Sequence, residues 1–312
     1  MDADIQIMLE RRLGRLYARQ RLGIERELEG KIFGRGTKHF HPENWYSASG
    51  LIRFTLKACG LYGRGRRNAE RVVLTENEIA FPDLPAAFDG FTILHLSDLH
   101  VEKCAKAMER AAALATETRY DIAVLTGDFR FKTYGPYEGT LAGLAQLRPH
   151  FRAPVYAVLG NHDSIRMVPG LEAMGIRMLL NEAEVIRRGE EAIHLAGIDD
   201  AGFYGVDNIQ GAGEEIPHGA FAILLSHTPE VYRQAAHAGF RLMLSGHTHG
   251  GQICLPGGVP IILDAALPRR YGSGAWEHEG MVGFTSRGTG SSIVPVRFNC
   301  PPEVVLHRLR RS

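Results

Sequence analysis

Five short polar clusters, each directly behind an apolar run of strand type, constrain the fold of this chain more than any other feature. The apolar runs occupy residues 91–97, 122–126, 154–159, 221–225 and 242–245. Short, nearly continuous apolar runs are typical of strands that are buried on both faces. In an open α/β sheet, ligands bind outside the carboxyl ends of the strands, so these strand-end clusters are expected to meet in one crevice.

The clusters contain seven side chains that end in a carboxylate, an amide or an imidazole: Asp98, His100, Asp128, Asn161, His227, His247 and His249. Oxygen and imidazole ligands without a thiolate suit Mn, Fe, Zn or Mg and do not suit a structural zinc cage. One tetrahedral ion does not need so many ligands, whereas two divalent ions that share a bridging carboxylate would use them all. Paired ions of this kind stabilise the attacking and leaving oxygens of a phosphoryl displacement.

The same clusters carry a resemblance to a known family. Asp98-Leu99-His100, Gly127-Asp128, Gly160-Asn161-His162-Asp163, His227 and Gly246-His247-Thr248-His249 occur in the order found in calcineurin-like metallophosphoesterases. The longer string that continues through Gly250-Gly251-Gln252 resembles the bacterial branch of small phosphodiesterases and phosphatases. Five motifs in order are a specific signal. The resemblance implies an α/β fold, with a two-sheet sandwich flanked by helices.

The resemblance also implies a role for each residue. Asp98, His100, Asp128 and His249 would hold the first metal. The second would be held by Asp128 as the bridge, with Asn161, His227 and His247. His162 matches a histidine that faces the leaving group, and Asp163 stands where it could orient that ring. Manganese is the favoured metal.

The expected activity is hydrolysis of a phosphoester or a pyrophosphate by a metal-activated hydroxide. Phe129-Arg130-Phe131 after the second motif differs from the pattern of protein Ser/Thr phosphatases and of purple acid phosphatases. One alternative is a hydrolase of the UDP-2,3-diacylglucosamine pyrophosphatase type, although that activity's best-known family has Arg where this chain has His162. An alternative of another class is a protein-binding scaffold that keeps the fold and little catalysis.

Weaker signals predict where a substrate would be held. Arg269 and Arg270 are candidates for a distal phosphate, and Tyr271 for a nonpolar group. Arg130 and Arg287 are further candidates, with solvent exposure as the alternative for Arg130. The loop over residues 199–219 is predicted to be solvated surface. The substrate is expected to be a phosphorylated small molecule or a lipid-linked phosphate.

Charge is distributed unevenly along the chain. Residues 1–71 carry a net charge of +7 and the remainder −6, within an overall charge of +1. The division predicts a basic amphipathic appendage and linker over residues 1–70 and a catalytic domain over residues 71–312. The appendage would meet either an anionic membrane surface or its own acidic domain. No nucleic-acid partner is expected, because the catalytic part lacks a basic footprint.

The amino-terminal part also yields structural expectations. Residues 5–28 read as one amphipathic helix, and glycine-rich residues 30–70 as an irregular segment with an apolar stretch at 51–61. No apolar run reaches the ~18 residues of a membrane span, and the start lacks the features of a signal peptide. The four cysteines have no metal-site or disulfide spacing. Cytoplasmic residence is expected, with peripheral contact at the inner membrane face left open.

The remaining elements follow from periodicity. Residues 72–74 and 79–81 are predicted to form a hairpin, and residues 102–118 a helix that links parallel strands. Residues 141–147 are predicted to form a short helix. His95 lies inside a strand and is expected to be a core histidine.

Overall fold

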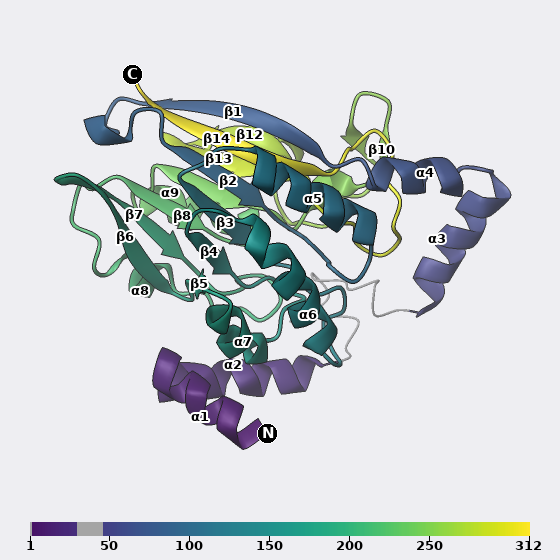
Figure 1. The fold of residues 1–312 in the computed structure, drawn as a ribbon, viewed down its shortest axis with the longest axis horizontal. Helices are drawn as coiled ribbons and strands as arrows, with labels where there is room; N and C mark the ends of the chain where they lie inside the picture. Colours follow the sequence, from purple (N-terminus) through teal and green to yellow (C-terminus); the bar gives the residue numbers. More distant parts are fainter. Residues whose placement is uncertain (1, 30–45) are drawn as a thin grey trace.

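Two six-stranded sheets packed face to face make up the body of the molecule, and helices cover both outer faces (Figure 1). The fold is that of a computed structural model, which describes residues 2–29 and 46–312. The helices are α1 (Asp2–Leu13), α2 (Arg15–Leu28), α3 (Tyr46–Ala58), α4 (Tyr62–Ala69), α5 (Ala105–Glu117), α6 (Glu138–Leu147), α7 (Val168–Ala173), α8 (Ile209–Gly213) and α9 (Tyr232–His237). The predicted α/β class and two-sheet arrangement are confirmed.

The first sheet has the strand order β1-β14-β2-β3-β4-β5. Its strands are β1 (Val73–Phe81), β14 (Glu303–Arg311), β2 (Thr92–Leu96), β3 (Ile122–Thr126), β4 (Val155–Val158) and β5 (Ile176–Met178). Strands β2 to β5 run parallel to one another, and β14 is antiparallel to β2. The carboxyl ends of β2, β3 and β4 therefore lie at the same edge.

The second sheet has the order β12-β13-β9-β8-β7-β6. Its strands are β12 (Gly274–His278), β13 (Met281–Thr285), β9 (Leu242–Ser245), β8 (Ala222–Leu225), β7 (Glu191–Gly197) and β6 (Glu182–Arg188). Strands β13, β9, β8 and β7 are parallel. A small antiparallel pair, β10 (Cys254–Leu255) and β11 (Val259–Pro260), projects from the body.

Side-chain alternation divides each central strand between two cores. In β2, Ile93 packs into the core between the sheets, whereas Leu94 packs against the helices outside the first sheet. The inter-sheet core continues with Ile223 and Leu244 from the second sheet. Because these strands are covered on both faces, their sequences read as continuous apolar runs.

The amino-terminal helices differ from the prediction of one helix over residues 5–28. Gly14, with φ of 87°, separates α1 from α2. Glycine reaches that conformation without steric penalty, so the chain turns there. Leu9, Ala18 and Leu22 are buried in the core outside the first sheet, so the apolar stripe packs on the chain's own body.

The segment predicted to be irregular is partly helical. Residues 30–45 lie outside the described residues, and the rest forms α3 and α4. The hairpin predicted over residues 72–81 is also wrong, because β1 is one continuous strand that pairs in parallel with β14. Within the described ranges 2–29 and 46–312, no helix combines the length and apolar character of a membrane span.

Candidate metal centre

The five polar clusters lie at the carboxyl ends of five strands, as their positions in the sequence predict. The first sheet supplies Asp98 and His100 after β2, Asp128 after β3 and Asn161 after β4. The second sheet supplies His227 after β8, and His247 and His249 after β9. Both sheets therefore deliver polar side chains to the same edge of the sandwich.

The backbone of this edge is held in an unusual conformation. Five of the ten described non-glycine residues with positive φ belong to the clusters, namely Asp98, His100, Asp128, His247 and His249. A non-glycine residue in the left-handed region costs about 1–3 kcal/mol, and such residues concentrate at functional sites. The turns aim successive side chains into the crevice in spite of that cost.

Glycines allow the strand ends to approach closely. A Cβ on Gly127 would lie 2.5 Å from the backbone nitrogen of Gly160, and Gly127 has φ of 84°. A Cβ on Gly246 would lie 1.8 Å from Ser97 Oγ and 2.3 Å from an Asp98 carboxylate oxygen. A larger residue at either position would push the polar clusters apart.

The first cluster brings together Asp98, His100 and His249, whose ligand atoms lie within 4.8 Å of one another. His100 Nδ1 donates to the carbonyl of Arg130 at 2.8 Å, which leaves Nε2 facing His249 Nε2 at 3.1 Å. His249 Nε2 also lies 3.4 Å from Asp98 Oδ1. Two imidazole nitrogens and a carboxylate directed at one point are a suitable donor set for a divalent ion.

The second cluster brings together Asn161, His227 and His247. Asn161 Oδ1 lies 2.8 Å from His227 Nε2 and 2.9 Å from His247 Nδ1, and the two nitrogens are 3.2 Å apart. His227 Nδ1 donates to the carbonyl of Thr126 at 2.8 Å, so its Nε2 faces the cluster. Hydrogen bonds to the remote ring nitrogen fix the tautomer in metal sites.

Asp128 lies between the two clusters. Its Oδ1 is 3.4 Å from His227 Nε2, and its Oδ2 is 3.8 Å from His100 Nε2. The backbone N–H of His162 donates to Asp128 Oδ1 at 2.9 Å. One carboxylate thus has an oxygen directed at each cluster, which is the arrangement that a bridge between two ions requires.

The electrostatics of the cluster suit cations. Burial alone would raise the pKa of Asp128, but the imidazoles of His162 and His227 hold it well below its usual range. Although burial opposes protonation, Asp128 and Asp98 raise the pKa of His227 to about 10. Burial and the charges of His100 and Arg297 hold the pKa of His249 well below its usual range. The buried carboxylates therefore draw a proton onto His227, and a metal ion could replace that positive charge. The residues fit a divalent dimetal centre.

His162 lies beside this centre. Its Nδ1 is directed at the carbonyl oxygen of Phe131, and its Nε2 lies 3.7 Å from Asp128 Oδ2. The carbonyl of Phe131 therefore orients the ring, in the role that the sequence had offered to Asp163.

Asp163 binds the backbone of two loops and does not orient the His162 ring. Its carboxylate accepts hydrogen bonds from the backbone N–H groups of Phe129 at 2.9 Å, Arg130 at 3.1 Å and Gly160 at 2.9 Å. Burial and the nearby charge of Asp128 raise the pKa of Asp163 to about 7. Asp163 ties the loop after β3 to the loop after β4.

A buried network under these loops was not predicted from the sequence. The fully buried guanidinium of Arg21 on α2 donates to Asp199 at 3.0 Å, to Glu25 at 3.0 Å and to the carbonyl of Asp163 at 3.0 Å. Glu25 in turn accepts from the backbone of Ile165 at 3.1 Å. The prediction of a solvated loop over residues 199–219 is wrong at its start, because Asp199 and Asp200 are buried. No local pattern marks the network, since its members lie far apart in the sequence.

Arg297 is a second buried cation that the sequence did not reveal. Its guanidinium lies 3.2 Å from His249 Nδ1 and donates to the carbonyl of His249 at 3.3 Å. It also donates to the carbonyl of Gly288 at 3.3 Å. Arg297 thus supports the turn that presents His249.

The residues predicted to contact substrate do not share one environment, as the ligand residues do. Arg130 is buried, not exposed, and donates to the carbonyls of His162 at 2.7 Å and Gly135 at 3.0 Å. Arg287 pairs with Glu303. Tyr271 is buried against Tyr232, with ring centroids 4.8 Å apart.

Arg269 and Arg270 are exposed. The Arg270 guanidinium stacks 4.7 Å from the ring centroid of Tyr271. Substrate contact by either arginine stays a prediction.

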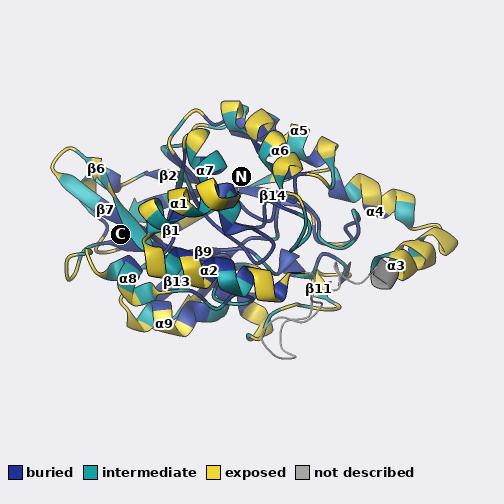
Figure 2. Ribbon diagram, turned by 90° about the horizontal axis from the view of Figure 1, so that it is seen from below, coloured by how far each residue is buried: buried dark blue, intermediate teal, exposed yellow. Residues whose placement is uncertain are grey.

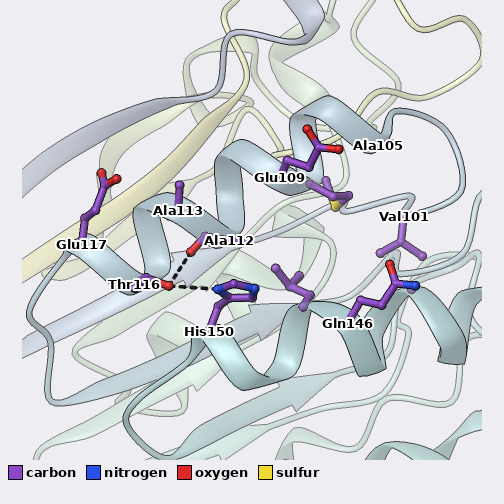
Figure 3. Close-up of a pocket in the computed structure, with 12 residues that line it drawn as sticks. Val101, Ala105, Glu109, Ala112, Ala113, Thr116, Glu117, Gln146 and His150 are labelled. Atoms are coloured by element: carbon purple, nitrogen blue, oxygen red, sulfur yellow. Dashed lines mark hydrogen bonds between the residues drawn. The ribbon is translucent and has the colours of Figure 1, made fainter.

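A groove of about 560 Å³ lies between α5 and α6 (Figure 3). Small residues such as Ala105 and Ala112 line it together with Glu109, and Thr116 lies 3.0 Å from His150 Nδ1. The lining contains none of the candidate metal ligands.

Comparison with known proteins identifies the family. The family described as calcineurin-like phosphoesterase matches residues 91–251, more than half of the chain, and this range includes every candidate ligand. The chain belongs to this family. Membership and the Asp/His cluster together make it a metal-dependent phosphoric ester hydrolase.

Several bacterial members of this calcineurin-like phosphoesterase family are similar over most of their length. The uncharacterized metallophosphoesterase YkoQ of Bacillus subtilis is 31% identical over 258 residues, which are 79% of this chain and 93% of YkoQ. The uncharacterized metallophosphoesterase YkuE of the same organism is 29% identical, over 84% of this chain and 94% of YkuE. The phosphodiesterase YaeI of Escherichia coli is 29% identical, over 70% of this chain and 82% of YaeI.

Proposed function

We propose that this chain hydrolyses a phosphoester or pyrophosphate bond at a site that holds two divalent ions, with manganese favoured. The observation that carries the proposal is the pair of donor clusters on either side of the Asp128 carboxylate. Asp98, His100 and His249 would hold one ion and Asn161, His227 and His247 the other, with Asp128 shared. When bound, the ions would supply Lewis-acid charge and lower the pKa of a water molecule.

The chain's own residues would divide the remaining work. Asn161 contributes a neutral oxygen, so the second cluster holds a cation without adding a further negative charge. A protonated His162, fixed by the carbonyl of Phe131, would donate from Nε2 to the oxygen that leaves. A lipid-linked phosphate, as in the UDP-2,3-diacylglucosamine alternative, stays a prediction about the substrate.

Two variants test this division of labour. His162→Ala should lose turnover of a p-nitrophenyl phosphodiester by roughly 10²–10⁴-fold, the usual range for general acid catalysis, while it retains its metal. Asp128→Ala should lose both turnover and metal, because a shared ligand is removed. Metal content is measured by mass spectrometry after reconstitution with Mn, Mg, Zn or Fe.

Each of these proteins has an outcome that would contradict the proposal. Full metal occupancy in the Asp128→Ala protein would overturn the bridging role. Turnover in the His162→Ala protein equal to that of the unchanged chain would remove His162 from the mechanism. Absence of metal and of turnover in the unchanged protein would favour the scaffold alternative.

A further inference from the structure

Helix α3 stands away from the body of the molecule, with α4 as its main neighbour (Figure 1). Figure 2 shows α3 largely exposed at one end of the structure. Leu51 and Phe54, three residues apart and therefore on one side of the helix, are 67% and 71% exposed. Large apolar side chains in such positions mark surfaces that bind a partner.

The charges of this segment all have one sign. Residues 46–69 contain five Lys or Arg residues and no Asp or Glu. Arg53 and Lys57, four residues apart, share one side of α3, and Lys57 is three residues from Phe54, so the cations border the exposed apolar side chains. Cations beside exposed large apolar residues are suited to the interface of an anionic bilayer, where acidic headgroups border the apolar layer.

A second group of exposed apolar side chains lies at the same end of the molecule. The β10–β11 hairpin and the residues after it expose Leu255, Val259, Ile261 and Ile262, the last of them by 73%. Figures 1 and 2 show this hairpin and α3 at the end where α4 joins the body. The exposed Arg269 and Arg270 follow in the same loop.

Both groups are attached to one segment behind the metal centre. The backbone N–H of Arg297 donates to the carbonyl of Gly65 on α4 at 2.9 Å, and Cys254 N–H donates to the carbonyl of Phe298 at 2.9 Å. The side chain of the same Arg297 donates to the carbonyl of His249 at 3.3 Å. Helix α4 and the start of the β10–β11 hairpin are therefore bonded to the segment that also contacts a candidate metal ligand.

We propose that α3, α4 and residues 255–262 form a docking surface for an anionic lipid bilayer, which we call the α3 surface. The occupant is argued from charge, because five cations without an acidic residue suit acidic headgroups beside an apolar layer. Docking in this way would place the metal centre close to the lipid–water boundary. The proposal does not require hydrolysis, so it can fail or succeed separately from the proposed function.

Vesicle flotation tests the α3 surface with the full chain. The protein should float with phosphatidylcholine vesicles that contain phosphatidylglycerol and stay in solution with phosphatidylcholine alone. The double variant Arg53→Gln, Lys57→Gln should lower the partition coefficient roughly 25-fold, since each cation near an anionic surface contributes about a fivefold factor. The double variant Leu51→Gln, Phe54→Gln should also lose flotation.

Matched controls come from the amino-terminal helices. The double variant Arg11→Gln, Arg15→Gln removes two exposed cations four residues apart, and Leu16→Gln removes a leucine that is 79% exposed. Both controls should float as the unchanged protein does. All variants should keep the circular dichroism spectrum and the urea unfolding midpoint of the unchanged protein, which shows that they fold whether or not the chain is active.

Three results would overturn the proposal. The unchanged protein would fail to float with acidic vesicles, or the α3 variants would float as well as the controls. Alternatively, light scattering would show a dimer that becomes a monomer in the Leu51→Gln, Phe54→Gln protein, which would make the α3 surface an interface between two copies.

Discussion

Buried histidines in this molecule have two different roles. Those at the metal centre have ring nitrogens directed at one another, whereas His95 and His307 are buried in the body with His95 Nδ1 3.2 Å from His307 Nε2. Sequence alternation correctly identified His95 as a core residue. Motif spacing selected seven candidate ligands, and the structure brings their side chains together at one edge of the sandwich. It could not reveal Arg21 or Arg297, because their partners are distant in the sequence and meet them only in the folded chain.

The His95–His307 pair predicts a loss of stability in acid. Burial lowers the pKa of His95 to about 4 and, with the charge of His95, holds the pKa of His307 well below its usual range. The unfolded chain, with a histidine pKa of about 6.5, then binds more protons than the folded chain below that pH. The contribution of this pair to the free energy of unfolding is therefore fully present above about pH 6.5, and it is lost as the pH decreases toward 4.

Urea unfolding at pH 6.5 and pH 5 measures this effect. The free energy of unfolding should decrease between pH 6.5 and pH 5. In the His95→Gln protein this decrease should be about 1–2 kcal/mol smaller than in the unchanged protein. The control His218→Gln changes an exposed histidine and should leave the decrease unaltered. Equal decreases in all three proteins would contradict the assignment of a neutral buried pair.

At the scale of elements, the strands that carry site residues were predictable and the amino-terminal region was not. Buried parallel strands have continuous apolar sequences, so β2, β3, β4, β8 and β9 were found within a few residues of their ends. β1 was mistaken for a hairpin because polar residues such as Glu76 and Asn77 interrupt it, which an edge strand tolerates. Glycine-rich residues 46–69 gave no clear helical signal, yet they form α3 and α4.

The contact between α2 and the loop after β4 predicts a large effect from one residue. Arg21→Gln removes a fully buried guanidinium, which leaves the buried Asp199 carboxylate without its cation and Glu25 with Arg166 alone. Breaking a buried ion pair in this way costs about 3–5 kcal/mol. Chemical denaturation should show that decrease in the free energy of unfolding.

The matched control lies on the same helix. Arg19, whose side chain is 58% exposed, pairs with Glu10 at 2.8 Å. Arg19→Gln should change the free energy of unfolding far less than Arg21→Gln, because exposed ion pairs contribute little. If Arg21→Gln and Arg19→Gln had similar effects, α2 would not be held in place by the buried network.

At the scale of the whole molecule, the uneven charge distribution corresponds to a contact between the amino-terminal helices and the body. The basic amino-terminal helices meet acidic groups of the body, as in the pairs of Arg12 with Glu172 at 2.9 Å and with Glu182 at 2.5 Å. The sequence left open whether these helices meet a membrane or the chain's own body, and contacts of this kind depend on tertiary packing. The division into an appendage and a catalytic domain at residue 70 stays a prediction.

Side chains from both sheets are expected to surround two neighbouring cations, and anomalous diffraction from crystals of the manganese-reconstituted protein can locate them. We expect two manganese peaks per chain, one among Asp98, His100 and His249 and one among Asn161, His227 and His247, with Asp128 between them. A single peak, or peaks remote from these side chains, would contradict this expectation.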